Sequence, residues 1–218
     1  MFKKVLSNTV LSVSVLAAMT ANAAAPGVYV TGQLGYANTH MSNKTRFDKH
    51  DIDLGKNHDL ANNGIAGRLA LGYQFNQNFA VEVGYLGLSQ RKLDIPNTFL
   101  KDEPGSATLQ LQQHAIDLVG KGILPVTQTI NVYGKLGVAY LTTDLNAKIV
   151  SGKDATLGLN HYANVAKHKW APEAAIGVSY DFTPNVSIDT SWTHIQPLGS
   201  NKPGNIDFVA VGVGYNFG

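Results

Sequence analysis

Large apolar residues alternate with small or polar ones in several segments of the chain. In the last segment, residues 206–218, the large residues share one face and the other face is mostly glycine and alanine. A soluble sheet usually turns its large apolar side chains toward a core and its polar side chains toward water. Large apolar residues outside, a small or polar interior and aromatic residues near the end are typical of a transmembrane β-barrel strand.

The same alternation predicts seven further strands, which cover residues 28–36, 64–75, 79–88, 114–124, 130–141, 170–182 and 186–194. Short polar turns alternate with long polar connections, and the long ones cover residues 37–63, 89–113, 142–169 and 195–205. Bacterial barrels combine an even strand number with short periplasmic turns and long surface loops. We therefore predict an all-β, eight-stranded antiparallel transmembrane up-and-down β-barrel, closed because no strand edge can stay unpaired in hydrocarbon. A soluble calyx would invert the two faces, and the glycine-rich inner face argues against it.

Residues 1–23 have the pattern of a secretory signal peptide. Lys3 and Lys4 precede an apolar run at residues 10–19, and residues 21–23 form an A-x-A cleavage site. The apolar run is too short for a spanning helix, which needs about 20 residues. We expect cleavage after Ala23, export through the periplasm, and one barrel domain of residues 24–218 in the bacterial outer membrane.

Composition excludes several kinds of function. Removing residues 1–23 takes two of the 17 basic residues and none of the 15 acidic ones, so the mature chain holds 15 of each and is formally neutral. A nucleic-acid partner is therefore not expected. The absence of cysteine excludes a disulfide framework and a zinc-thiolate site.

Five segments resemble the transmembrane domain of the outer-membrane protein A family. They are residues 30–36 (VTGQLGY), 72–87 (GYQFNQNFAVEVGYLG), 132–139 (VYGKLGVA), 175–184 (AIGVSYDFTP) and 211–218 (VGVGYNFG). The resemblance implies a monomeric eight-stranded barrel at the bacterial surface. Members of the family often carry a peptidoglycan-binding domain after the barrel. Because this chain stops at Gly218, we expect no such domain and no cell-wall anchoring.

Alternation also places seven charged side chains in the barrel interior. They are Arg68, Glu82, Asp117, Lys121, Lys135, Glu173 and Asp189. Glu82 and Lys121 have similar depths on neighbouring strands, which predicts an ion pair that Asp189 can join across the lumen. The other bases and Asp117 are expected about a layer higher. Because a buried charge is retained only when it is paired, we interpret the set as a polar plug.

The resemblance adds an alternative role for these charges. In the family resembled, a glutamate and a lysine that match Glu82 and Lys121 belong to a switchable salt-bridge gate. The family's second acid and its arginine match Ser179 and Asp189, so half of that gate differs. An eight-stranded barrel is about filled by its side chains, so the alternative is a narrow, intermittently open channel.

All seven histidines fall in the long connections or at the adjoining strand ends. His50 and His58, with Asp51 and Asp53, are weak candidates for a divalent-metal site because imidazole and carboxylate groups bind such ions. No H-x-x-x-H pair is present, and we assign no metal and no other cofactor.

Another alternative is a lipid hydrolase, which needs a hydroxyl nucleophile beside a base. The candidates are Ser191 with His194, and His114 with Ser89 or Ser106. Ser191 and His194 belong to opposite faces of one strand, and no G-x-S-x-G elbow is present. We therefore expect that the protein is not an enzyme.

The leading interpretation is a structural outer-membrane protein that presents four loops to host cells, phage or other surfaces. Its surroundings would be outer-membrane lipids, including lipopolysaccharide. Val213, Tyr215 and Phe217 also resemble the C-terminal insertion signal read by the barrel-assembly machinery, although Gly218 follows the aromatic residue here.

Overall fold

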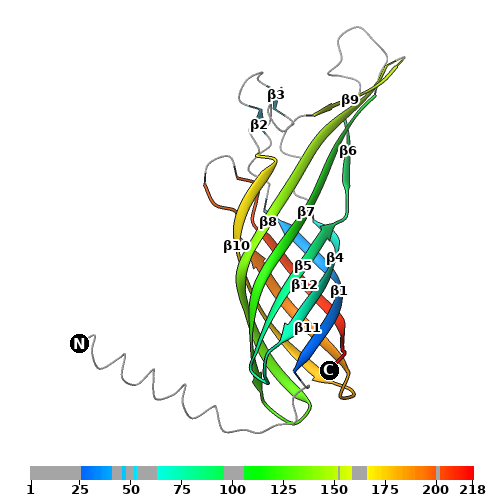
Figure 1. Ribbon diagram of the computed structural model, residues 1–218. Helices are drawn as coiled ribbons and strands as arrows, with labels where there is room; N and C mark the ends of the chain where they lie inside the picture. The colour runs from blue at the N-terminus through cyan, green and yellow to red at the C-terminus, as the bar shows by residue number, and fades with distance from the viewer. Residues whose placement is uncertain are drawn as a thin grey trace, which may run out of the picture.

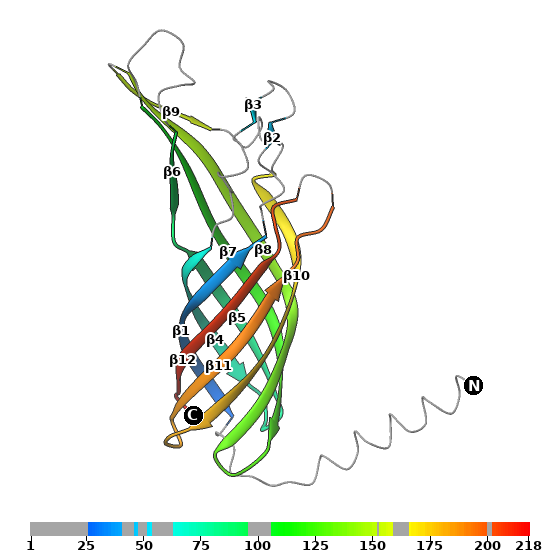
Figure 2. The same cartoon turned by 180° about the vertical axis from the view of Figure 1, so that it is seen from behind.

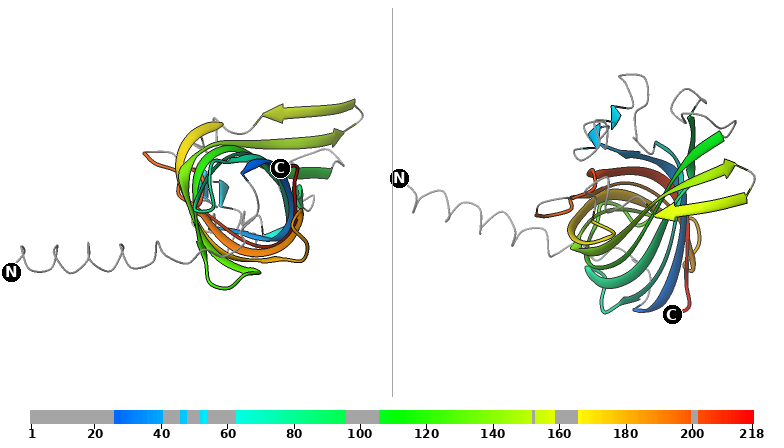
Figure 3. Two further views of the ribbon diagram at one scale, coloured as in Figure 1. Left: turned by 60° about the horizontal axis from the view of Figure 1, so that its bottom comes forward. Right: turned by 90° about the horizontal axis from the view of Figure 1, so that it is seen from above.

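Eight long strands form a closed antiparallel barrel in the computed structural model (Figure 1). The structure describes residues 26–40, 46–47, 52–53, 63–95, 106–151, 153–158, 166–199 and 202–218. The barrel strands are β1 (Gly27–Thr39), β4 (Gly64–Gln74), β5 (Phe79–Leu88), β7 (Ser106–Pro125), β8 (Ile130–Ser151), β10 (His168–Asp181), β11 (Val186–Ile195) and β12 (Ile206–Asn216). Neighbours in this order pair with each other, and β12 pairs with β1 to close the ring (Figure 3). The predicted fold class is confirmed.

Four shorter strands complete the described secondary structure. They are β2 (Arg46–Phe47), β3 (Ile52–Asp53), β6 (Arg91–Ile95) and β9 (Lys153–Gly158). Within the described residues, no helix is long and apolar enough to span a bilayer.

Three short turns gather at one end of the barrel, which we call the turn end; the opposite end is the loop end (Figures 1 and 2). The three turns share one pattern of hydrogen bonds. The side-chain oxygens of Asn76, Thr127 and Thr183 accept hydrogen bonds from the backbone N–H groups two and three residues later. Asn and Thr favour turns because their side chains can replace a backbone acceptor in this way.

The two faces of the barrel wall differ as the alternation predicts. Outward positions expose large apolar side chains, among them Leu34, Leu69, Leu136 and Val211. Exposed aromatic residues flank this apolar band at both ends, namely Phe75, Phe79, Phe182 and Phe217 toward the turn end and Tyr36, Tyr85, Trp170 and Trp192 toward the loop end. Such aromatic bands mark the two interfaces of a membrane.

Two of the expected long connections, residues 89–113 and 142–169, are largely strand, and the short strands β2 and β3 lie in a third, residues 37–63. β7 and β8 remain paired up to Ser106 opposite Val150, whereas the last described pairs with β5 and β10 are at His114 and Thr142. The expectation that residues 106–113 and 142–151 are loop was therefore wrong. Residues 106–113 (SATLQLQQ) alternate polar and apolar residues, and a sheet outside the membrane tolerates this pattern because neither face must meet lipid.

These extensions form what we call the projecting sheet, which consists of β6, residues 106–113 of β7, residues 143–151 of β8, and β9. β6 pairs with β7, and β9 pairs with β8. The sheet rises beyond the other strands and leans away from the barrel axis (Figures 1, 2 and 3). In the described part of the chain, β6 and β9 each pair on one side only, so both leave a strand edge open.

Candidate functional site

Glycines make room for a polar cluster in the lower lumen. A Cβ atom at Gly212 on β12 would lie 2.5 Å from Asp189 Oδ1 and 2.6 Å from Gln33 Cγ. A Cβ at Gly84 on β5 would lie 2.6 Å from the guanidinium of Arg68. The bare inner positions at Gly212 and Gly84 therefore let long side chains from neighbouring strands meet across them.

Glu82 is the centre of what we call the charge layer, the seven charged side chains of the predicted plug. Its carboxylate is 0% exposed. The Oε2 atom is 2.6 Å from Lys135 Nζ and 3.1 Å from Arg68 Nη1. The Oε1 atom is 3.4 Å from Lys121 Nζ and accepts a 2.8 Å hydrogen bond from the Tyr29 hydroxyl. One acid thus holds all three bases of the layer.

Arg68 connects Glu82 to a second acid. Its Nε and Nη2 atoms donate to the two carboxylate oxygens of Asp117, at 3.1 Å and 2.5 Å. Such two-point contacts fix geometry as well as charge. Arg68 and Lys135 were expected about a layer above Glu82, yet both reach it. Their side chains are long enough to cover one step of two residues along a strand.

Asp189 and Glu173 are held differently. Asp189 Oδ2 accepts hydrogen bonds from Gln33 Nε2 and the Tyr133 hydroxyl, both at 2.7 Å, so neutral donors replace the predicted contact with Lys121. Glu173 is 3% exposed, and its Oε2 atom has no hydrogen-bond partner among the described residues. Their position on the inner face alone did not indicate which of the interior carboxylates form an ion pair with a basic side chain.

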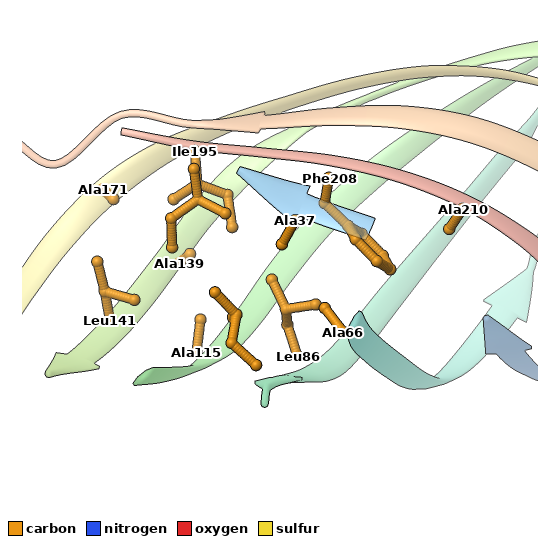
Figure 4. Packing of buried hydrophobic residues seen from close by; sticks show 12 residues of the cluster. Ala37, Ala66, Leu86, Ala115, Ala139, Leu141, Ala171, Ile195, Phe208 and Ala210 are labelled. Atoms are coloured by element: carbon orange, nitrogen blue, oxygen red, sulfur yellow. The ribbon is translucent and has the colours of Figure 1, made fainter. Parts of the chain in front are cut away.

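Toward the loop end, beginning level with Arg68 and Glu173 of the charge layer, which are register partners of Leu86 and Ile195, buried apolar side chains gather in the lumen (Figure 4). This apolar layer takes residues from all eight barrel strands, namely Ala37, Ala66, Leu86, Leu88, Ala115, Ala139, Leu141, Ala171, Ile195, Ile206, Phe208 and Ala210. Phe208 is 0% exposed, and Leu86, Leu141 and Ile195 are buried with it. Sequence reasoning missed this closure because it described the inner face as small or polar.

Ser191 and His194, the first of the hydrolase candidates, do not form a catalytic pair. Ser191 faces the lumen, where it accepts a hydrogen bond from Gln33. His194 faces outward, and its Nδ1 atom lies 2.8 Å from Asp207 Oδ1. His114 stacks on Tyr85 with ring centres 5.9 Å apart.

Other predicted site residues lie outside the described part of the chain or on the outer wall. His50, Asp51 and His58 lie outside the described residues, as do the side chains of Asp53 and Ser106. The three residues of the suggested insertion signal, Val213, Tyr215 and Phe217, are exposed on the outer face. The rings of Tyr215 and Phe217 pack edge to face at 5.0 Å.

Relatives in sequence agree with this architecture. Residues 23–218 match the family model described as OmpA-like transmembrane domain. An uncharacterized protein of Coxiella burnetii is 27% identical over 219 residues, covering 90% of this chain and 87% of that protein. Outer membrane protein A of Yersinia pseudotuberculosis is 29% identical over 154 residues, covering 67% of this chain and 38% of that protein. Outer membrane protein P5 of Haemophilus influenzae is 25% identical over 225 residues, covering 95% and 59%. The matches therefore span less than two thirds of the last two relatives.

Solved structures show the same fold. Neisserial surface protein A superimposes with a TM-score of 0.51 at 18% identity, covering 88% of this chain and 97% of that one. The outer membrane protein OprG of Pseudomonas aeruginosa gives a TM-score of 0.53 at 16% identity, covering 90% and 99%. At these identities the likeness concerns the fold alone.

Proposed function

Because the chain belongs to the family of OmpA-like transmembrane domains, we propose that this bacterial outer-membrane barrel is a structural protein whose loop end contacts other surfaces. We propose host cells or phage as its partners. Short turns face the periplasm in bacterial barrels, so the loop end is on the outside of the cell. The named relatives are outer-membrane proteins, and we propose no enzymatic activity.

The projecting sheet is the observation that carries this proposal. It extends eight register positions of β7, from Gln113 to Ser106, beyond the last described pair with β5. At about 3.3 Å per residue this is roughly 26 Å of paired strand. In the described part of the chain, the unpaired edges of β6 and β9 offer backbone N–H and C=O groups to a partner segment.

A deletion tests this role without cutting the barrel. Thr143 N donates to Lys167 O at 2.8 Å, and Lys167 Nζ lies 2.9 Å from Asp144 Oδ1. Residues 145–166 can therefore be removed and Asp144 joined to Lys167, which already contact each other. We expect cells carrying this variant to lose binding to host-cell monolayers.

The matched control removes residues 41–62 from another loop. Thr39 N donates to Asn63 Oδ1 at 3.1 Å, so these chain ends also lie close together. This control should keep binding. Unchanged binding after deletion of residues 145–166, at equal surface level, would refute the role of the projecting sheet.

A gated channel is a second candidate function, and the long contact between Lys121 and Glu82 favours it. Lys121 is 14% exposed and 3.4 Å from Glu82, whereas Lys135 is 5% exposed and 2.6 Å away. Lys121 is therefore the base best able to move. The buried apolar layer argues against a steady pore, and we rank the channel second.

We also propose that the barrel is a monomer inserted by the barrel-assembly machinery after cleavage of residues 1–23, and that lipopolysaccharide surrounds its loop end. Phe217 is 63% exposed on the outer face, so its removal should cost the folded barrel little. Phe217→Ala should therefore lower the amount of assembled protein more than it lowers the unfolding free energy of purified barrel. Quantitative immunoblots of membranes measure the first quantity, and equal amounts of mutant and parent would disprove the insertion role.

A further inference from the structure

A small polar cavity lies beneath the charge layer at the turn end of the lumen. Its volume is about 60 Å³, enough for a few water molecules or a molecule of glycine's size. The residues that line it include Thr31, Lys121, Asn131, Asp181, Ser187 and Gly214. The cavity does not overlap the projecting sheet and is independent of the proposed surface role.

One positive and one negative side chain line the cavity. Among the described residues, Lys121 Nζ has one ion-pair contact, at 3.4 Å from Glu82 Oε1, and it sits 4.5 Å and 5.3 Å from the ring centres of Tyr133 and Tyr29. Because an ammonium group has three N–H donors, donors remain for a ligand. Asp181 is half-buried, and its Oδ2 atom accepts a 2.9 Å hydrogen bond from Asn131. Its other carboxylate oxygen remains able to accept from a ligand.

Thr31, Ser187 and Gly214 complete the cavity wall. Thr31 is 9% exposed, and its Oγ1 atom is buried without a hydrogen-bond partner in the described structure. That oxygen is shielded from the cavity as well as from bulk water, and the Cγ2 methyl group of Thr31 is the atom that faces Gly214, 3.3 Å from where a Cβ would lie. Gly214 keeps the space open, because a Cβ there would lie 2.6 Å from Ser187 Oγ.

We propose that this cavity binds a small zwitterion, of the class of free amino acids as small as glycine. The ligand carboxylate accepts hydrogen bonds from Lys121 Nζ, and its ammonium group donates to Asp181. A simple anion would face the Asp181 carboxylate, and a simple cation would face Lys121. A zwitterion satisfies both and adds no net charge to a low-dielectric lumen. The apolar layer blocks the path toward the loop end, so the ligand enters and leaves at the turn end.

Titration of the refolded barrel in detergent micelles with glycine tests the site, with amide chemical shifts of Thr31 and Gly214 as the readout. Saturable shifts are expected for glycine, and acetate and methylamine should bind at least about tenfold more weakly, because each lacks one charged contact. Lys121→Met and Asp181→Asn should each raise the Kd for glycine by about tenfold or more. Lys167→Met removes a lysine at the loop end and is the matched control, with an unchanged Kd.

Thr31→Val keeps the side-chain shape and removes a hydroxyl that a molecule in the cavity cannot reach, so it is a second control and should leave the Kd for glycine unchanged. Heat-modifiable gel mobility verifies folding of every variant. If Lys121→Met does not fold, Asp181→Asn decides the question. Absence of saturable glycine binding would overturn the proposal, as would acetate binding as tightly as glycine or an unchanged Kd in Asp181→Asn.

Discussion

The charge layer and the apolar layer close the same lumen by different physical means. In the charge layer, Glu82 gathers three bases through contacts of 2.6 to 3.4 Å, so each group depends on a specific partner. In the apolar layer, Phe208 packs with apolar side chains from all eight strands, and these contacts have no preferred direction. The first layer is therefore sensitive to the loss of one key group, whereas the second responds to lost volume.

Glu82→Gln should have the largest effect, because it leaves Arg68, Lys121 and Lys135 buried without their shared anion. Breaking a buried ion pair by removing one partner costs about 3 to 5 kcal/mol, and this substitution breaks three contacts. Urea unfolding of the refolded barrel in lipid vesicles measures the loss.

Glu173→Gln is the matched control for that substitution. It changes an equally buried acid whose Oε2 has no described hydrogen-bond partner, so little stability should be lost. If both substitutions lowered the unfolding free energy equally, the stability of the charge layer would not depend on specific ion pairs. The proposed difference between the charge layer and the apolar layer would then be wrong.

Phe208→Ala should come next, with a loss of about 3 kcal/mol from the cavity that it leaves in the apolar layer. The ion pairs of Glu82 should survive, because no described contact joins Phe208 to them. Val209→Ala, on the outer face of the same strand, is the control and should cost much less.

A double-mutant cycle of Phe208→Ala with Glu82→Gln sharpens the comparison. We expect the two losses to add within about 0.5 kcal/mol, as for residues without shared partners. A larger coupling energy would show that the two layers act as one unit.

Within the charge layer, Lys135→Met should destabilise more than Lys121→Met. Lys135 makes the shorter and more buried contact with Glu82, and hydrogen bonds to charged groups contribute about 1.5 to 3 kcal/mol. The same urea transition measures both variants. The reverse order would identify Lys121 as the main partner of Glu82.

Asp144→Asn should have the smallest effect, below about 1 kcal/mol, because its pair with Lys167 is exposed to solvent at the loop end. A loss as large as that of Lys135→Met would show that burial does not explain the strength of the interior pairs.

Alternation could predict the barrel because it fixes which side chains face lipid and which face the lumen. It could not choose the partners of Arg68 or Asp189, because these depend on side-chain reach and on neutral donors such as Gln33 and Tyr133. Phe208 was missed as a closing residue because a pattern of small inner residues hides a few large ones near the strand ends. Ile195 was missed because it was assigned to the connection of residues 195–205, whereas β11 extends to it. The projecting strands were missed because their polar residues resemble loop composition.

Planar-bilayer conductance of the refolded barrel tests the central claim, that the lumen is closed and the protein acts at its loop end. The parent barrel should show no steady conductance, because the apolar layer blocks the path above the ion pairs. Steady conductance in the parent that disappears in Glu82→Ala or Lys121→Ala would contradict the claim and establish a channel gated by the charge layer.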